Sequence, residues 1–199
     1  MPPPRVLDRY VWLERLEVVL AALPQSTRRR IALDLVRRCR DLTKDVRSLE
    51  RELRTRMREL APELLEIPGC SAVCAANLVG QTAGAARFSG DAAFAMHVGV
   101  APLPVSSGQT NRHRLNRCGN RRLNSTIHMI AVTRARMHPP AIVCMQRKQA
   151  GGMSYREALR CLKRLLARVV FKTMLRTERA AAGCVVTPCF RTDPVAIAV

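Results

Sequence analysis

IPGCSAVCAANLVGQTAG, at residues 67–84, marks the point where one long helix gives way to a compact domain. Proline disfavours helical geometry in the residue before it and glycine supplies a left-handed turn, so a preceding helix should end at Ile67-Pro68-Gly69. A second helix, rich in small residues, should run to a cap at Gly84. Helix, glycine turn and helix predict a helix-hairpin-helix, in which backbone N–H groups at Gly69 and Ser71 face a phosphate. A plain helical hairpin is the alternative, because Ser71 stands where such motifs usually carry a second glycine.

Before this turn, apolar residues recur in steps of four and three, which is a heptad pattern. They are Leu35, Cys39, Leu42, Val46, Leu49, Leu53 and Leu60. The pattern predicts a coiled-coil helix over residues 25–66 that pairs with another helix, so a homodimer or higher oligomer is expected. An amphipathic helix packed on its own domain would show the same stripe. Residues 1–24 are interpreted as a leader or truncated linker.

After the turn, further helical segments predict a compact helical domain over residues 67–178. Ser89 is placed to cap a helix over residues 91–98 that Gly99 ends. Another helix is expected from Asn120 to about His138, where Pro139-Pro140 stops it. The last opens at Ser154, with Glu157 completing a capping box, and runs to about Thr177. Residues 179–199 are expected to form a flexible tail, and the fold class is mainly α.

Positive charge dominates the composition, with 34 Lys and Arg against 15 Asp and Glu and a net charge of +19. The excess lies in the second half, because residues 105–199 hold 18 basic and 3 acidic side chains. Nearly all of the basic residues are Arg, whose planar fork matches phosphate. DNA or RNA is therefore the expected partner. No signal peptide, membrane span or aromatic membrane-binding face is predicted, so a cytoplasmic location is expected.

Eight cysteines raise the question of a metal site. Cys70 and Cys74 are four residues apart, and His97 or His113 would have to complete the ligand set. No second paired-ligand motif occurs at zinc spacing, so buried apolar cysteines are the preferred interpretation and no metal or other cofactor is expected in this chain.

Chemistry-bearing residues concentrate in VAPLPVSSGQTNRHRLNRCGNRRLN, residues 100–124, which is predicted to be an irregular loop. A serine attacks a phosphodiester only if a base takes its proton and nearby groups stabilise the charge on phosphorus. His113 is a candidate base, and Gly108 would let the backbone approach a phosphate. The candidate charge-stabilising residues are Arg112, Arg114, Arg117, Arg121 and Arg122. By composition alone, a phosphate-contacting loop is favoured over a catalytic centre.

Six short motifs occur in order between Ile67 and Leu175: IPG, Arg87-Phe88, the GVAP stretch from Gly99 to Pro102, Ser107-Gly108, the GNRRL helix start at Gly119, and the distal EALRCLKR. This ordered set, over a little more than half of the chain, resembles the C-terminal domain of insertion-sequence 110 family transposases. The heptad helix is similar to the coiled-coil linker of that family. Two residues depart from the family pattern: Ser71 replaces the second glycine of the hairpin, and Cys118 stands where the family usually has glycine or a small polar residue.

The resemblance implies a bacterial DNA recombinase that moves an insertion sequence and is guided by a structured RNA. It implies Ser107 as the nucleophile, with Ser106 less favoured. The predicted nucleic-acid-binding residues are Gly69, Ser71, Gly108, Arg112, Arg114, Arg117, Asn120, Arg121 and Arg122. In the family, four acidic residues of an N-terminal RuvC-like domain bind Mg²⁺. That domain is expected to be missing here, because the acidic residues before Ile67 lie on amphipathic helices. The chain alone is therefore expected to be inactive, and a non-catalytic nucleic-acid-binding or dimerisation module is the alternative.

Overall fold

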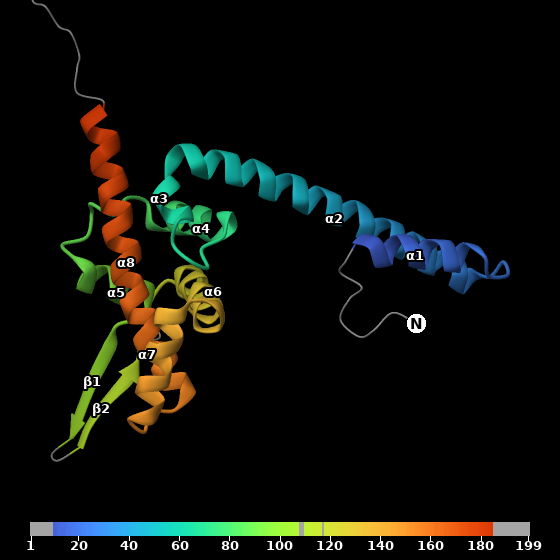
Figure 1. The fold of residues 1–199 in the computed structure, drawn as a ribbon. Helices are drawn as coiled ribbons and strands as arrows, with labels where there is room; N and C mark the ends of the chain where they lie inside the picture. Colours follow the sequence, from blue (N-terminus) through green and yellow to red (C-terminus); the bar gives the residue numbers. More distant parts are fainter. Residues whose placement is uncertain (1–9, 108–109, 117, 185–199) are drawn as a thin grey trace, which may run out of the picture. The chain divides into compact units, whose positions relative to one another are not determined.

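The structure is a computed structural model that describes residues 10–107, 110–116 and 118–184, with the backbone alone at residues 106–107, 110–115 and 183–184. Helices account for most of it, and one two-stranded sheet interrupts them (Figure 1), so the prediction of a mainly α fold is confirmed. The chain divides into two compact units between Arg56 and Met57.

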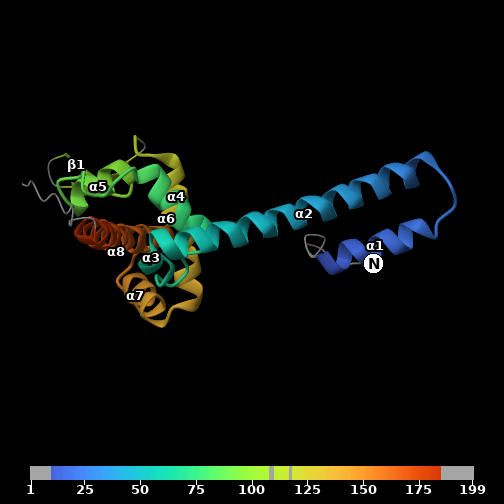
Figure 2. The same cartoon turned by 90° about the horizontal axis from the view of Figure 1, so that it is seen from above.

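The first unit consists of α1 (Tyr10–Ala21) and most of α2 (Thr27–Leu60), which lie side by side in both views (Figures 1 and 2). Glu17 on α1 accepts hydrogen bonds from Arg37, at 2.9 Å, and from Arg40 on α2. Residues 10–21, expected to belong to a leader or linker, thus form a helix paired with α2. Several heptad positions of α2 stay more than half exposed, namely Leu35, Leu42, Val46 and Leu49. The coiled coil remains a prediction.

The long helix ends earlier than the sequence suggested. Ala61 leaves helical geometry, with φ −155° and ψ 64°, and Pro62 begins the short α3 (Pro62–Leu65). Proline has no N–H to continue the ladder and its ring crowds the preceding turn, so α2 stops at Leu60. Ile67-Pro68-Gly69 forms the following turn, and α4 (Ala72–Thr82) is closed by left-handed Ala83 rather than by Gly84.

Two local predictions between α4 and α6 are wrong. α5 (Asp91–Val98) begins after Gly90 without a side-chain cap, so Ser89 does not cap it, although Gly99 ends it as predicted. The expected irregular loop is an antiparallel ribbon of β1 (Pro102–Ser107) and β2 (Thr110–Leu115). Alternate amides of an edge strand point away from its partner, so prolines two residues apart, at 102 and 104, are compatible with pairing.

The C-terminal helices follow the predicted starts more closely than the predicted ends. α6 (Arg121–Met137) agrees with the prediction, but Pro139-Pro140 opens a further helix, α7 (Pro139–Ala150), at positions that need no intrahelical N–H. The capping box before α8 (Tyr155–Cys184) is confirmed, because Ser154 N donates to Glu157 Oε2 at 2.9 Å. α8 runs past Thr177 to Cys184, and the predicted tail from residue 185 onward lies outside the described residues.

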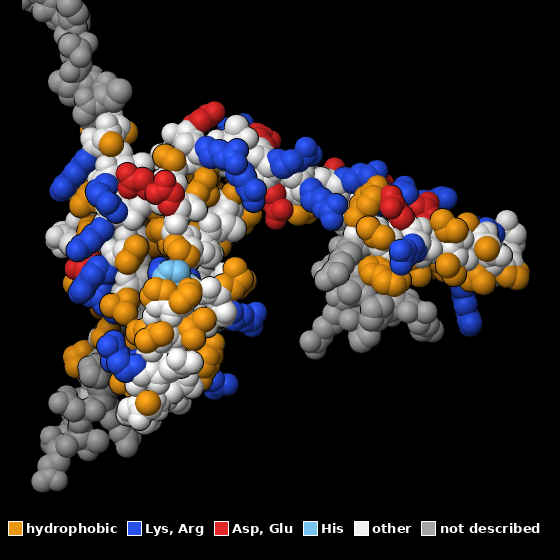
Figure 3. Space-filling model, viewed as in Figure 1, with side chains coloured by type: hydrophobic (Ala, Val, Ile, Leu, Met, Phe, Trp, Pro, Cys, Tyr) orange, Lys and Arg blue, Asp and Glu red, His pale blue; other side chains and the backbone are white. Residues whose placement is uncertain are grey.

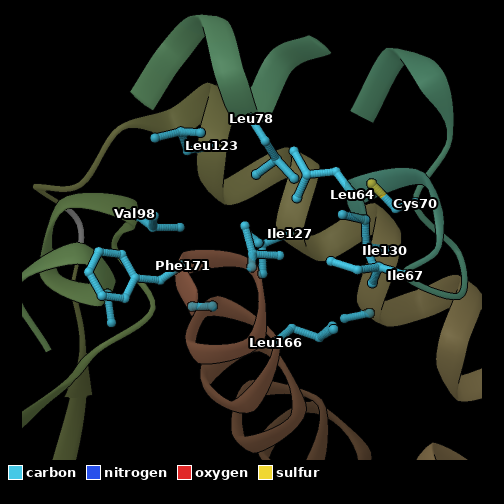
Figure 4. Packing of buried hydrophobic residues seen from close by; sticks show 14 of the residues in the cluster. Leu64, Ile67, Cys70, Leu78, Val98, Leu123, Ile127, Ile130, Leu166 and Phe171 are labelled. Atoms are coloured by element: carbon cyan, nitrogen blue, oxygen red, sulfur yellow. The ribbon is translucent and has the colours of Figure 1, made fainter. Parts of the chain in front are cut away.

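α8 packs against α3, α5, α6 and α7 and organises the second unit (Figure 2). The core holds side chains from each of these elements and from α4 (Figure 4). Phe94 on α5 stacks on Phe171 of α8 with ring centroids 5.5 Å apart. Side chains of this size each stabilise the fold by about 1.5–3 kcal/mol when buried. Within the described part of the chain, the helices are all too short or too polar to cross a membrane.

Candidate nucleic-acid interface

The ribbon carries the serine positions singled out in the sequence and extends away from the helices of its unit (Figure 1). Its register pairs Ser107 with Thr110, Val105 with Arg112 and Leu103 with Arg114. Successive strand residues alternate between faces, so positions 107, 112 and 114 lie on one face. At about 3.3 Å per residue, position 112 is about 7 Å along the strand from position 110, which is opposite Ser107.

His113 occupies a different face of the ribbon. It pairs with Pro104, and Ser106 pairs with Asn111 on that same face. The register therefore groups position 113 with Ser106 and separates it from Ser107, the favoured nucleophile. Gly108 and Arg117, also predicted to contact nucleic acid, lie outside the described residues.

At the base of the ribbon, the chain segment before β1 and the segment after β2 are in direct backbone contact. Gly99 ends α5 with φ +76°, and Gly119 precedes α6. A Cβ added to Gly119 would lie 2.3 Å from both Cα and N of Gly99, a distance that no side chain tolerates. The glycines at 99 and 119 thus allow the strand that leaves α5 and the strand that enters α6 to meet.

Three asparagines, each four residues apart, complete the base of the ribbon. Asn116 Nδ2 donates to Met96 O at 3.1 Å, and Asn124 Nδ2 donates to Val98 O at 3.1 Å and Gly99 O at 3.0 Å. Between them, Asn120 N donates to His97 O at 2.7 Å. These bonds satisfy carbonyl groups at the end of α5, where the helix itself supplies few N–H partners. The ribbon is therefore fixed to α5 and α6 by a polar network.

Asn120, predicted to bind nucleic acid, is the N-cap of α6. Its Oδ1 accepts hydrogen bonds from the backbone N–H groups of Arg122, at 2.9 Å, and Leu123, at 3.1 Å. Its Nδ2 donates to Gln81 Oε1 of α4 at 3.3 Å. Arg121 and Arg122 are exposed in the first turn of α6, where the helix dipole is positive. Their two guanidinium groups make this end of α6 suited to phosphate.

The turn before α4 contains the other two predicted contacts, Gly69 and Ser71. Ser71 is exposed, and its Oγ caps α4 by accepting from Cys74 N at 3.3 Å. Gly69 has φ +83°, and a Cβ there would come within 3.2 Å of Ile130 O and Thr133 on α6. Glycine at 69 therefore serves the close packing of the turn on α6, while the N-terminus of α4 stays accessible at Ser71.

Lys163 and the group around His97 were not predicted from the sequence. Lys163 Nζ of α8 donates to Asn124 Oδ1 at 2.6 Å and thereby joins the ribbon base to the last helix. Burial, and secondarily Arg160, lowers the pKa of Lys163. The only sequence signal was its place among the basic residues of the last helix.

Arg87 and Phe88 position His97 from the side. Arg87 Nη2 lies 3.3 Å from His97 Nε2, and its guanidinium carbon lies 4.5 Å from the centroid of the Phe88 ring. Burial first, and then the charge of Arg87, lowers the pKa of His97. Both effects favour the neutral ring, and because a guanidinium can only donate, Nε2 is the acceptor in this contact. Because His97 O holds Asn120, this group supports the start of α6.

Among the described residues, no three His, Cys, Asp or Glu side chains are arranged to hold a metal ion. Cys70 is a core residue, and burial, with a smaller effect of Cys74, raises the pKa of its thiol to about 12. This thiol is protonated at neutral pH, which disfavours metal binding there.

Residues 61–146 match the Transposase IS116/IS110/IS902 family. The matched region runs from the end of α2 through most of α7 and includes the whole ribbon. No curated protein matches the chain.

Proposed function

We infer the function from the family: residues 61–146 belong to the IS116/IS110/IS902 family of transposases, as part of the C-terminal region of such an enzyme, and the chain has a role related to transposition. We propose that the second unit binds DNA, together with a structured guide RNA, and presents Ser107 as the nucleophile for strand cleavage and transfer.

One observation carries this proposal. Support comes from the backbone register of the ribbon, in which positions 107, 112 and 114 fall on one face, and from the anchoring of the ribbon directly before Arg121 and Arg122. A sugar-phosphate backbone lying along that face would have a hydroxyl position and a row of guanidinium positions beside it. Arg at such sites gives affinity for phosphate without sequence preference.

In the proposed reaction, Ser107 Oγ forms a bond to the phosphorus of a phosphodiester as its proton passes to a base. The bond from phosphorus to one deoxyribose oxygen breaks, and that oxygen takes up a proton and leaves as a hydroxyl. The phosphoserine ester that remains is attacked by another deoxyribose hydroxyl, which rejoins the strand and releases Ser107. Since position 113 lies on the other face, we place the base outside the ribbon. Guanidinium groups at positions 112 and 114 would stabilise the charge that develops on phosphorus.

Mg²⁺ does not fit the described residues, which hold no suitable cluster of acidic side chains. We propose that the metal belongs to a RuvC-like domain acting together with this region, and that residues 10–184 alone do not cleave DNA. No step above depends on a metal bound to this chain.

A second proposal, a dimerisation role for α2, rests on a different observation. Leu35, Leu42, Val46 and Leu49 recur at heptad spacing and are between 53% and 60% exposed. Such a stripe is buried when two helices pair. A self-association constant measured by analytical ultracentrifugation, and its loss in the variant Leu42→Glu, would support this role.

The serine assignment is tested by replacing Ser107 with Ala, with Ser106→Ala as the matched control one residue away. Each chain is combined with a RuvC-like domain of the family, Mg²⁺ and a supercoiled or branched DNA substrate. We expect Ser107→Ala to abolish strand cleavage and Ser106→Ala to retain it, while both bind DNA as the wild type does. Equal activity of Ser107→Ala and wild type would remove the nucleophile assignment and leave a binding module.

A further inference from the structure

One face of α6 meets one face of α8 at a group of basic side chains that the serine chemistry does not use. Lys163 Nζ donates to Asn124 Oδ1 at 2.6 Å, so these two positions are in contact. Arg160 lies one turn before Lys163 on α8, and His128 lies one turn after Asn124 on α6. Arg160 lowers the pKa of Lys163, and Lys163 lowers that of His128, in each case after the larger effect of burial. The three side chains therefore share one electrostatic environment.

Three other basic residues of α8, namely Arg164, Arg168 and Arg176, have acidic partners. Arg168 Nε lies 2.7 Å from Asp91 Oδ2, and Arg164 Nη1 lies 3.9 Å from the same oxygen. Arg176 lies 4.0 Å from Glu63. Basic side chains are prominent along α8 in Figure 3. Their charges are thus partly balanced within the fold.

Lys163 and Arg160 differ in this respect. Among the described residues, no carboxylate oxygen lies within 4.0 Å of either side chain. The pKa of Glu157, one turn before Arg160, is lowered chiefly by its hydrogen bonds with Ser154 and least by the charge of Arg160, so its main partner is Ser154, with Oε2 2.7 Å from Oγ. Lys163 is half-buried, and its one hydrogen bond within the described chain goes to a neutral amide. A partly desolvated ammonium group without an anion is costly, so an external anion would be bound favourably here.

The position of this group indicates which anion. Arg121, Asn124 and His128 occupy positions i, i+3 and i+7 of α6, which form one stripe along the helix. The group therefore continues the line that begins at the proposed nucleic-acid contacts of Arg121 and passes the base of the ribbon. We propose that Lys163, Arg160 and His128 form a binding site for one phosphate of the bound nucleic-acid backbone. The inference rests on the proposed function, because it assigns a further contact to the same ligand.

Lys163 would also connect phosphate binding to the ribbon. Its partner Asn124 holds Val98 O and Gly99 O, where the chain leaves α5 for β1. A bound anion would favour the charged form of Lys163, and charged Lys163 holds Asn124 at the base of the ribbon.

The test measures how salt weakens binding of the full 199-residue chain to a fluorescein-labelled 30-base-pair DNA duplex. For each phosphate that the protein no longer neutralises, the slope of log K against log salt concentration falls by about one. We expect the double variant Lys163→Gln/Arg160→Gln to show a slope smaller by about one, because both side chains serve a single phosphate. Arg160→Gln alone, at an exposed position, should weaken binding at every salt concentration without affecting the fold.

Lys172→Gln is the matched control. It removes one positive charge from the same helix, at an exposed position nine residues and so about half a turn away from Lys163 around the axis. We expect its slope to equal that of the wild type. The phosphate site is wrong, and the proposed function stays intact, if the wild type binds the duplex with a steep salt dependence and both Arg160→Gln and the double variant keep the wild-type slope. An equal decrease of the slope in Lys172→Gln would overturn it too. If the wild type does not bind DNA, the proposed function itself fails.

Discussion

Replacing Gly119 with Ala tests whether the ribbon is held by the contact between two backbones. The new Cβ would lie 2.3 Å from Cα and N of Gly99 and 2.8 Å from the carbonyl carbon of Val98. Carbon atoms in contact are about 3.5–4.0 Å apart, so the backbones must separate by more than about 1 Å. The clash is with backbone atoms, and no rotamer change relieves it.

The magnitude follows from that separation. Overpacking of this kind costs about 1–3 kcal/mol. Moving Gly99 also stretches the hydrogen bonds from Asn124 Nδ2 to Val98 O and Gly99 O, now 3.1 and 3.0 Å, at about 1 kcal/mol each. We expect the free energy of unfolding to fall by about 3–5 kcal/mol, with a decrease in Tm of about 10 °C or more.

The assay is urea and thermal unfolding followed by circular dichroism at 222 nm, with Gly80→Ala as the control. Gly80 lies within α4, and a Cβ there would meet nothing within 4 Å. Alanine should therefore be neutral or stabilise by up to about 1 kcal/mol, as in other helices. A Gly119→Ala protein with the unfolding midpoint of the wild type would refute the close contact.

Three further substitutions test other parts of the second unit. Asp91→Asn removes the partner of Arg168, whose hydrogen bond is the main cause of the lowered pKa of Asp91. The ionised Asp91 therefore stabilises the fold above its ordinary pKa of 3.8, and this stabilisation is lost as the pH falls through the lower pKa of the folded state. We expect the urea midpoint of the variant to depend less on pH below pH 4 than that of the wild type. Glu178→Gln weakens the hydrogen bonds that the carboxylate of Glu178 accepts from Ala85 N, at 2.6 Å, and Ala86 N, at 3.0 Å. The free energy of unfolding in urea should fall by about 1–3 kcal/mol, and an unchanged midpoint would show that these two hydrogen bonds do not stabilise the fold. Ser154→Ala removes the cap of α8 and should cost about 1 kcal/mol by the same measurement, whereas Ser125→Ala, at an exposed position of α6, should cost less than about 0.5 kcal/mol.

Local signals in the sequence were sufficient for several helix boundaries. Ser154 and Glu157 are three residues apart and bond each other, so the start of α8 needed no tertiary information. Asn120 has the residue type of an N-cap, and α6 starts directly after it. The excess of arginine in the second half was visible from counting alone.

Prolines misled the prediction because the same residue can end a helix or begin one. Pro139 and Pro140 follow the end of α6, as predicted, but they also occupy the first turn of α7, which the sequence did not predict. Pro62 divides α2 from α3 at a point where the heptad stripe gave no sign of a break. In the ribbon, Pro102 and Pro104 argued against a strand, and only the partner strand shows that their positions tolerate it.

The base of the ribbon was beyond prediction from the sequence because its bonds join distant positions. Asn124 contacts Val98 and Gly99, and Lys163 reaches Asn124 across 39 residues of chain. No local pattern distinguishes these side chains from solvated ones. Gly119 was visible only as part of a short motif, and its contact with Gly99 depends on how α5 and α6 pack.

Trapping a covalent protein–DNA intermediate would identify the nucleophile directly. The chain is combined with a RuvC-like domain of its family, Mg²⁺ and an end-labelled DNA substrate, the reaction is stopped with detergent, and peptides bearing a nucleotide are identified by mass spectrometry. We expect the nucleotide to be attached through phosphorus to Oγ of Ser107. Attachment to Ser106 or to any other residue, or strand transfer that proceeds with no covalent protein–DNA species, would show that Ser107 is not the nucleophile.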